Sequence, residues 1–127
     1  MQRTPKLITA LNAVTATATS NAIDVADAKK ITLLVTRANN AGGTSAFSVS
    51  GSINGIDGTY VALNSLIEDL ANTKAENYTR TASVSIANAD GSKIASLDLE
   101  KNGFTHIKVT VTETADGTHS AKVLVQY

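Results

Sequence analysis

Histidine and carboxylate side chains are the groups of this 127-residue chain that could perform acid–base or metal chemistry. There are two histidines. His106 lies in an alternating run, and His119 follows the Asp116-Gly117 pair. The two rings could meet across the predicted hairpin, with Asp116 or Glu113 nearby, so a metal ion is one interpretation. Their spacing matches no known ligand motif, so the preferred interpretation is two surface histidines and no metal.

The Asn54-Gly55-Ile56-Asp57-Gly58 segment offers hard oxygen atoms that could bind calcium. It lacks the ligand order of an EF-hand loop. Asn-Gly and Asp-Gly pairs are also typical of tight turns, because these residues tolerate a positive φ. Turn formation therefore explains the segment without a metal.

Motifs of catalysis are missing from the sequence. There is no cysteine for a thiolate or a disulfide. Neither a phosphate-binding Gly-Lys-Ser/Thr loop nor a Gly-x-Ser-x-Gly elbow occurs. Aromatic residues are only 4% of the chain, with no tryptophan, which disfavours a sugar-stacking cleft. We expect a protein that is not an enzyme and uses no cofactor. A small enzyme or metal-dependent binding domain is kept as a hypothesis of another class.

Charge is balanced at 11 basic and 11 acidic residues, and charged residues make up 17% of the chain. Nucleic-acid binders usually carry a basic excess, so we expect no nucleic-acid partner. No stretch is long and apolar enough to span a membrane, and the polar segment at 9–20 argues against a signal peptide. The partner we expect is therefore another protein.

Apolar and polar residues alternate with a period of two, which is typical of strands with one buried face. The sequence predicts an all-β fold, an antiparallel β-sandwich or jelly roll of roughly eight short strands, in a single domain over 1–127. Strands are expected near residues 8–17, 22–25, 30–38, 45–53, 60–63, 82–86, 94–99, 104–113 and 119–127. The predicted core comprises Ile31, Leu33, Val35, Phe47, Val49, Val84, Ile86, Ile107, Val109, Val111, Val123 and Val125.

Two Asp-Gly pairs predict hairpins, because Asp-Gly suits the tight turns that join paired strands. One hairpin would join 82–86 to 94–99, and the other would join 104–113 to 119–127. Residues 63–70 are ambiguous: the spacing of their leucines fits a helix, and a crossing loop fits equally well.

Uncharged serine and threonine rows on the predicted strand faces leave the sheets poorly protected against edge pairing, so we expect a homo-oligomer. Residues 1–12 are predicted to form an extended N-terminal arm, since Pro5 blocks regular pairing. The arm and the loops supply the predicted partner-binding residues. These are Arg3, Pro5, Lys6, Leu7, Ile8, Asn40, Asn54, Asp57, Leu66 and Ile67.

Three stretches resemble small β-rich structural proteins of tailed bacteriophages. They are residues 19–35 (TSNAIDVADAKKITLLV), residues 46–55 (AFSVSGSING) followed by 58–63 (GTYVAL), and residues 103–111 (GFTHIKVTV) with Asp116-Gly117-Thr118. In those proteins a strand ending in Gly-Ser leads through an Asn/Asp-Gly turn to a short strand with an aromatic residue. Here Tyr60 stands at the aromatic position that tryptophan often occupies.

The resemblance implies a virion protein, and a capsid decoration (cement) protein is the preferred interpretation. Such a protein would sit on the outer capsid surface, bind the phage major capsid protein and stabilise the lattice. The resemblance also implies an oligomer on that surface, with a trimer favoured. The alternative is a tail- or fibre-associated module that recognises a host glycan or another tail protein.

Overall fold

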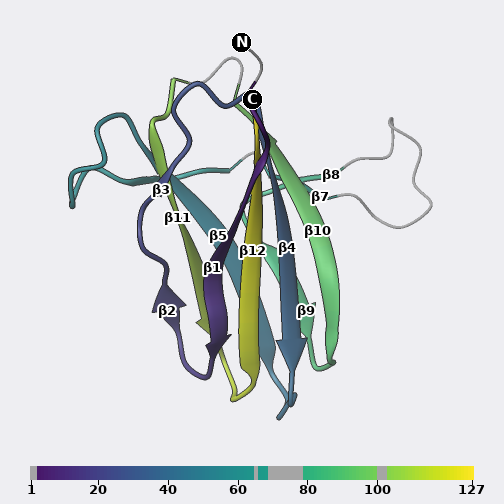
Figure 1. Cartoon of the computed structure of the whole chain (residues 1–127). Coiled ribbons are helices and arrows are strands. Elements are labelled where there is room, and N and C mark those ends of the chain that lie inside the picture. Colours follow the sequence, from purple (N-terminus) through teal and green to yellow (C-terminus); the bar gives the residue numbers. More distant parts are fainter. Residues whose placement is uncertain (1–2, 65, 69–78, 100–102) are drawn as a thin grey trace.

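The computed structural model describes residues 3–64, 66–68, 79–99 and 103–127, which form strands and loops and no helix. Figure 1 shows the strands as two layers, with both termini at one end. The strands are β1 (Lys6–Val14), β2 (Ala18–Thr19), β3 (Ile23–Asp24), β4 (Lys30–Ala38), β5 (Thr44–Ser52), β6 (Val61–Ala62), β7 (Leu66–Glu68), β8 (Thr79–Thr81), β9 (Val84–Ala87), β10 (Gly91–Asp98), β11 (His106–Glu113) and β12 (Thr118–Gln126).

Sheet A has six strands in the order β1-β12-β4-β10-β7-β8. Sheet B has the order β2-β11-β5-β6, with β3 also paired to β11 and β9 to β5. Every pairing is antiparallel. The prediction of an all-β antiparallel sandwich is confirmed.

The core lies between the two sheets because each long strand turns alternate residues inward. In β4, for example, Ile31, Leu33 and Val35 are fully buried, and in β11 so are Ile107, Val109 and Val111. All twelve predicted core residues are buried. The buried core further includes Leu11, Ile23, Val25, Leu66, Ala95, Leu97, Leu99 and Ala121. One apolar core therefore spans both sheets.

The two predicted hairpins are wrong. Strand β9 pairs with β5 in sheet B, while β10 pairs with β4 in sheet A. Likewise β11 lies in sheet B and β12 in sheet A. Each Asp-Gly connection therefore crosses from one sheet to the other as an arch. An arch and a hairpin both need a tight turn between alternating strands, so local sequence does not separate them.

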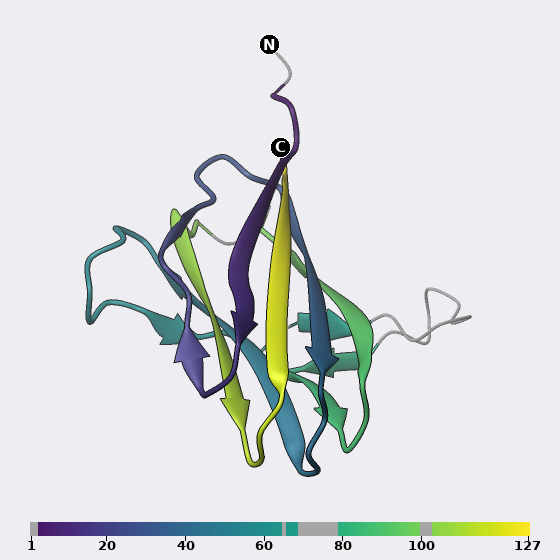
Figure 2. The same cartoon turned by 60° about the horizontal axis from the view of Figure 1, so that its bottom comes forward.

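Four connections of this kind meet at one end of the sandwich, drawn at the bottom of Figure 1 and brought forward in Figure 2. They comprise residues 15–17, 39–43, 88–90 and 114–117. The register places their flanking residues together: Val14 pairs with His119, His119 with Arg37, and Arg37 with Gly91. We refer to this end, with its four connections, as the closed end.

The segments with ambiguous predictions also take definite forms. Residues 66–68 form strand β7 of sheet A, so the described part of 63–70 is neither a helix nor only a loop; residues 65 and 69–70 lie outside the described residues. From Lys6 onward the predicted N-terminal arm is strand β1, paired with β12. This edge strand begins directly after Pro5 and contains two register shifts, which irregular edges use to resist unwanted pairing. Among the described residues there is no helix that could cross a membrane.

Candidate interaction surfaces

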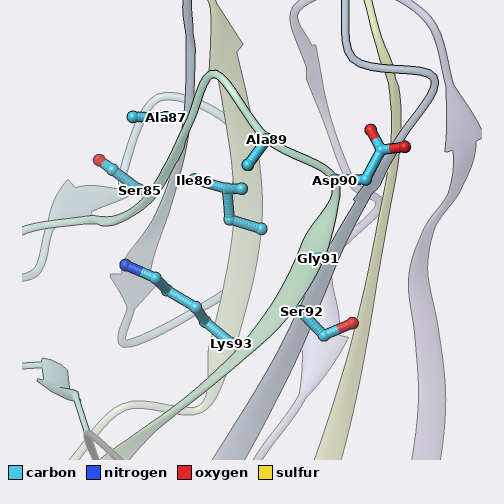
Figure 3. Close-up of a pocket in the computed structure, with 8 residues that line it drawn as sticks. All are labelled: Ser85, Ile86, Ala87, Ala89, Asp90, Gly91, Ser92 and Lys93. Atoms are coloured by element: carbon cyan, nitrogen blue, oxygen red, sulfur yellow. The ribbon is translucent and has the colours of Figure 1, made fainter.

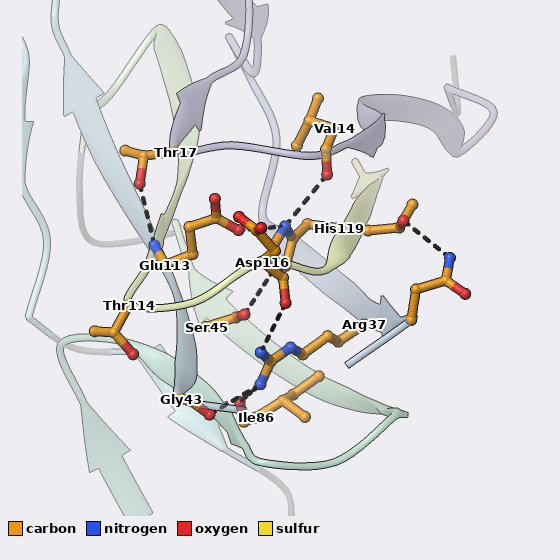
Figure 4. Close-up of polar contacts among 12 residues, drawn as sticks. Val14, Thr17, Arg37, Gly43, Ser45, Ile86, Glu113, Thr114, Asp116 and His119 are labelled. Atoms are coloured by element: carbon orange, nitrogen blue, oxygen red, sulfur yellow. Dashed lines mark hydrogen bonds and ion pairs between the residues drawn. The ribbon is translucent and has the colours of Figure 1, made fainter. Parts of the chain in front are cut away.

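A buried polar layer closes the core at the closed end. The inward rows of four strands each finish in a polar residue: Arg37 on β4, His119 on β12, Ser45 on β5 and Glu113 on β11 (Figure 4). Arg37 pairs with His119 across sheet A, and Ser45 pairs with Glu113 across sheet B. The four side chains therefore stack as one layer between the sheets.

Arg37 is 1% exposed and donates hydrogen bonds to backbone carbonyls of the surrounding connections. Nη1 reaches Gly43 O at 3.0 Å and Ile86 O at 3.2 Å. Nη2 reaches Gly42 O and, at 3.5 Å, Asp116 O. The guanidinium thus joins 39–43, β9 and 114–117. Nε has no partner in the described structure and lies against Gly117, where an added Cβ would approach it to 3.1 Å.

His119 is fully buried, so the prediction of a surface histidine is wrong. Its Nδ1 lies 3.2 Å from the Val14 carbonyl, which can only accept, and 3.5 Å from Glu113 Oε2. Nδ1 therefore carries a proton, which it donates to the Val14 carbonyl. Nε2 forms a hydrogen bond with the Ser45 hydroxyl at 2.6 Å.

The predicted meeting of the histidines does not occur. His106 lies at the opposite end of sheet B, where its Nδ1 is 2.8 Å from Thr105 Oγ1. Its ring packs against Gly55, where an added Cβ would come within 2.8 Å of Nδ1. In the described part of the chain, no three His, Asp or Glu side chains gather as a metal site would require.

The closed end also holds the predicted residue Asn40. Its backbone N donates to Asp90 Oδ1 at 2.8 Å, and its Oδ1 accepts from Gly42 N at 2.9 Å. Beside it a surface hollow of about 390 Å³ lies in the bend between β9 and β10 (Figure 3). Its lining comes from β9, from the 88–90 connection and from the start of β10. The residues are Ser85, Ile86, Ala87, Ala89, Asp90, Gly91, Ser92 and Lys93.

The loop at 53–60 is the second predicted contact region, and its residues Asn54, Asp57 and Thr59 find polar partners within the chain. Asn54 Oδ1 accepts hydrogen bonds from Ile56 N at 3.0 Å and Thr59 Oγ1 at 2.8 Å. Asp57 forms an ion pair with Lys108 at 3.1 Å. These contacts fit the turn interpretation of the segment. The same loop leaves Ile53 72% and Ile56 61% exposed.

The other predicted contact residues lie before strand β1, in strand β1 and in strand β7. Arg3 contacts its own chain, with its guanidinium 3.9 Å from the Tyr127 ring centroid and 3.7 Å from Asp27 Oδ2. Lys6 donates to the Asp24 carbonyl at 3.3 Å, and Pro5 is exposed. Ile8 packs against the core, while Leu7 and Ile67 point outward from sheet A. Leu66 is fully buried, so its prediction as a contact residue is wrong.

The two outer faces of the sandwich differ in chemistry. On sheet B, Thr19, Thr110 and Ser48 form a row across neighbouring strands, and the Thr19 and Thr110 hydroxyls are 2.9 Å apart. The nearby cation Lys108 is neutralised by Asp57. This face is the uncharged hydroxyl-rich surface that the sequence predicts.

The outer face of sheet A carries apolar side chains that sequence analysis missed. Among the large apolar residues there, Leu7 is 65%, Ile94 49% and Leu34 38% exposed, with half-buried Leu124 and Ile67 beside them. A signal for them is present in the sequence. Leu34 follows Leu33, and Leu124 follows Val123, so each stands at an outward position of an alternating strand.

The fold is similar to that of the SPBc2 prophage-derived protein YomS, with a TM-score of 0.66 and 11% sequence identity over 97% of this chain and 94% of that chain. The Eiger TNF from S. frugiperda gives a TM-score of 0.35 at 11% identity, over 97% of this chain and 68% of that one, which is too low to indicate a common fold. No protein-family model and no curated protein matches the sequence. At this identity the likeness to YomS shows the fold alone.

Proposed function

We propose that this chain is a structural protein of a bacteriophage particle and binds the outer capsid surface as a decoration protein. The observation that supports it best is the likeness to a prophage-derived protein over nearly the full length of both chains. The sequence resemblance to phage structural proteins points the same way. In this proposal the partner is the major capsid protein, and the chain works by binding, without catalysis or a cofactor.

Binding alone can stabilise a capsid lattice. A protein that binds only the assembled state adds RT ln(1 + [L]/Kd) per site, about 2.7 kcal/mol when its free concentration is a hundredfold above Kd. Many sites on one shell would then resist the pressure of packaged DNA. The requirement is a rigid scaffold, and the apolar core together with the polar layer at the closed end supplies one.

We further propose a homo-oligomer, with a trimer favoured. The hydroxyl-rich face of sheet B suits contact between copies, because a neutral surface meets its own copy without charge repulsion. Because a hydroxyl group both donates and accepts, serine and threonine hydroxyls of two copies can form hydrogen bonds across such a contact.

A tail- or fibre-associated binding module is the second candidate. The loop at 53–60 favours it, since a loop held by its own hydrogen bonds presents Ile53 and Ile56 at little ordering cost. Such a loop could bind a tail protein or a host glycan.

The test separates heads from tails. Particles from a culture that produces the encoding phage are fractionated on a density gradient, and the chain is quantified in each fraction. Decoration predicts the chain on heads, and heads without it should lose their DNA at a lower temperature. Recovery on tails would favour the second candidate. Absence from both fractions would overturn both.

A further inference from the structure

The outer face of sheet A presents a continuous apolar surface. Leu34 on β4 pairs directly with Ile94 on β10, and Leu7 on β1 pairs directly with Leu124 on β12. The pairs lie in adjacent rows, because Thr32 stands beside Leu124 and two residues before Leu34. Cross-strand partners lie about 5 Å apart, so these side chains contact one another. The surface is therefore a patch and not a set of scattered residues.

Exposed apolar patches of this kind on a single-domain protein commonly mark a contact surface. Packing within the sandwich does not explain them, since the core residues of the same strands already fill the interior. The flat footprint of β1, β12, β4 and the eight-residue strand β10 is about 500 Å², from strand spacings of about 4.8 Å and a rise of about 3.4 Å per residue. With a partner of equal area this reaches about 1,000 Å², where specific interfaces begin.

A free cation stands in the middle of this patch. Lys122 lies between Thr9 on β1 and Leu34 on β4, and its side chain is exposed. Among the described residues its ammonium group forms no hydrogen bond or ion pair. On the described strands of the same face, Lys30 and Arg80 lie further out, and Asp98 is the cross-strand partner of Lys30.

We infer that the outer face of sheet A docks on a partner protein whose facing surface is apolar and places a carboxylate opposite Lys122. The inference rests on the proposed function, in which that partner is the capsid. Charge favours a different protein over a second copy, because two such faces would oppose cations to cations. The single central lysine among leucines and threonines is too little charge for a nucleic-acid surface.

The test measures binding of the purified full-length chain to gradient-purified capsids from a phage strain that lacks its gene. The Leu34→Ser/Ile94→Ser double variant removes the apolar centre. Lys122→Gln removes the cation, and Lys122→Glu reverses it. Val61→Ser is the control, since it removes an apolar side chain that is more exposed, at 66%, from strand β6 of sheet B. Thermal unfolding of each variant confirms that it is folded.

We expect the double variant on sheet A to bind about 30-fold more weakly, as for two central contact residues. Lys122→Gln should weaken binding about 3-fold and Lys122→Glu about 10-fold, and the glutamine variant should lose part of the salt dependence seen with the wild type. The Val61→Ser control should bind within twofold of the wild type.

Three outcomes would overturn the inference, and they are distinguishable. If the wild type binds capsids and the sheet A variants bind equally well, the docking face is wrong while the proposed function stands. If the double variant instead abolishes self-association in sedimentation, the face covers a second copy. If the wild type does not bind capsids at all, the proposed function fails and the inference falls with it.

Discussion

The closed end and the outer face of sheet A depart from the alternation of the strands in opposite directions. At the closed end, inward positions carry Arg37 and His119, both almost fully buried. On the outer face, outward positions of the same two strands carry Leu34 and Leu124. One region therefore holds polar groups inside, and the other holds apolar groups outside.

The two departures differ in where their partners lie. The buried polar groups find most of theirs within the chain: Arg37 bonds to four carbonyls, and both ring nitrogens of His119 have hydrogen-bond partners. The exposed apolar groups of the described strands lie beside one another. Buried polar groups without partners are costly, so the first arrangement stabilises this fold against alternatives. The second contributes little to folding and points to a partner.

Replacing Arg37 should have the largest effect on stability of any change to the polar layer at the closed end. Arg37→Met keeps much of the side-chain length but removes the charged donor from carbonyls of three segments. Gly43 O and Asp116 O keep backbone donors, Asn88 N and Ala41 N, so the main loss is that of the charged hydrogen bonds themselves. Each such bond contributes about 1.5–3 kcal/mol, partly replaced by water entry, so we expect the free energy of unfolding to fall by about 3 kcal/mol. Urea denaturation monitored by circular dichroism measures it.

Lys122→Met is the matched control for Arg37→Met, because it makes the same chemical change on an outward position of the neighbouring strand. It should change the free energy of unfolding by less than about 0.5 kcal/mol. A loss below about 1 kcal/mol for Arg37→Met would show that the closed end does not depend on its guanidinium, and the contrast between the regions would disappear.

Removing the Ser45 hydroxyl should have the next largest effect on stability. Ser45→Ala leaves His119 Nε2 buried without its partner at 2.6 Å, at a cost of about 1–2 kcal/mol. Ser48→Ala, on the outward side of the same strand, is the control and should cost less than about 0.5 kcal/mol. Equal losses for the two variants, measured by the same denaturation experiment, would contradict a special role for the inward hydroxyl.

The core and most long strands could be predicted because alternation is a local signal. A β-branched residue at every second position, as in Val109 and Val111, already fixes which face is buried. The sandwich follows from many such strands. The same signal could not distinguish a hairpin from an arch at Asp116-Gly117, since that depends on whether β12 pairs with β11 or with β4 across the sheet.

The two departures were visible in the sequence but could not be interpreted from it. A polar residue such as His119 at an inward position is unfavourable until partners from β1 and β5 are known, and those partners lie 105 and 74 residues away. Leu34 beside Leu33 likewise fits either a strand buried on both faces or one with an exposed patch. Long-range strand pairing decides both cases. The predicted contact residues therefore lay on the N-terminal arm and the loops, and not on the outer face of sheet A.

Charge on the hydroxyl-rich face of sheet B should separate copies of the chain with little effect on folding. Ser48 and Thr110 are cross-strand partners, so Ser48→Lys/Thr110→Lys places two cations together at the centre of the face. We expect self-association to weaken about 10-fold in sedimentation velocity, with about 1 kcal/mol or less lost from stability. Unchanged association, or a monomeric wild type on and off the particle, would contradict contact between copies through sheet B.

The smallest effect is expected from Ile94→Thr on the outer face of sheet A. Ile94 is 49% exposed, so its replacement removes apolar area that is half in water already. Threonine keeps the branched Cβ that strands favour, and its neighbour Leu34 remains in place. We expect the free energy of unfolding to change by less than about 1 kcal/mol. The same change at the fully buried Ile31 should cost about 2–3 kcal/mol or more. Thermal denaturation of Ile94→Thr and Ile31→Thr side by side measures the difference. If the two variants lost equal stability, the outer face would be part of the folding core, and its exposed side chains would no longer indicate a partner.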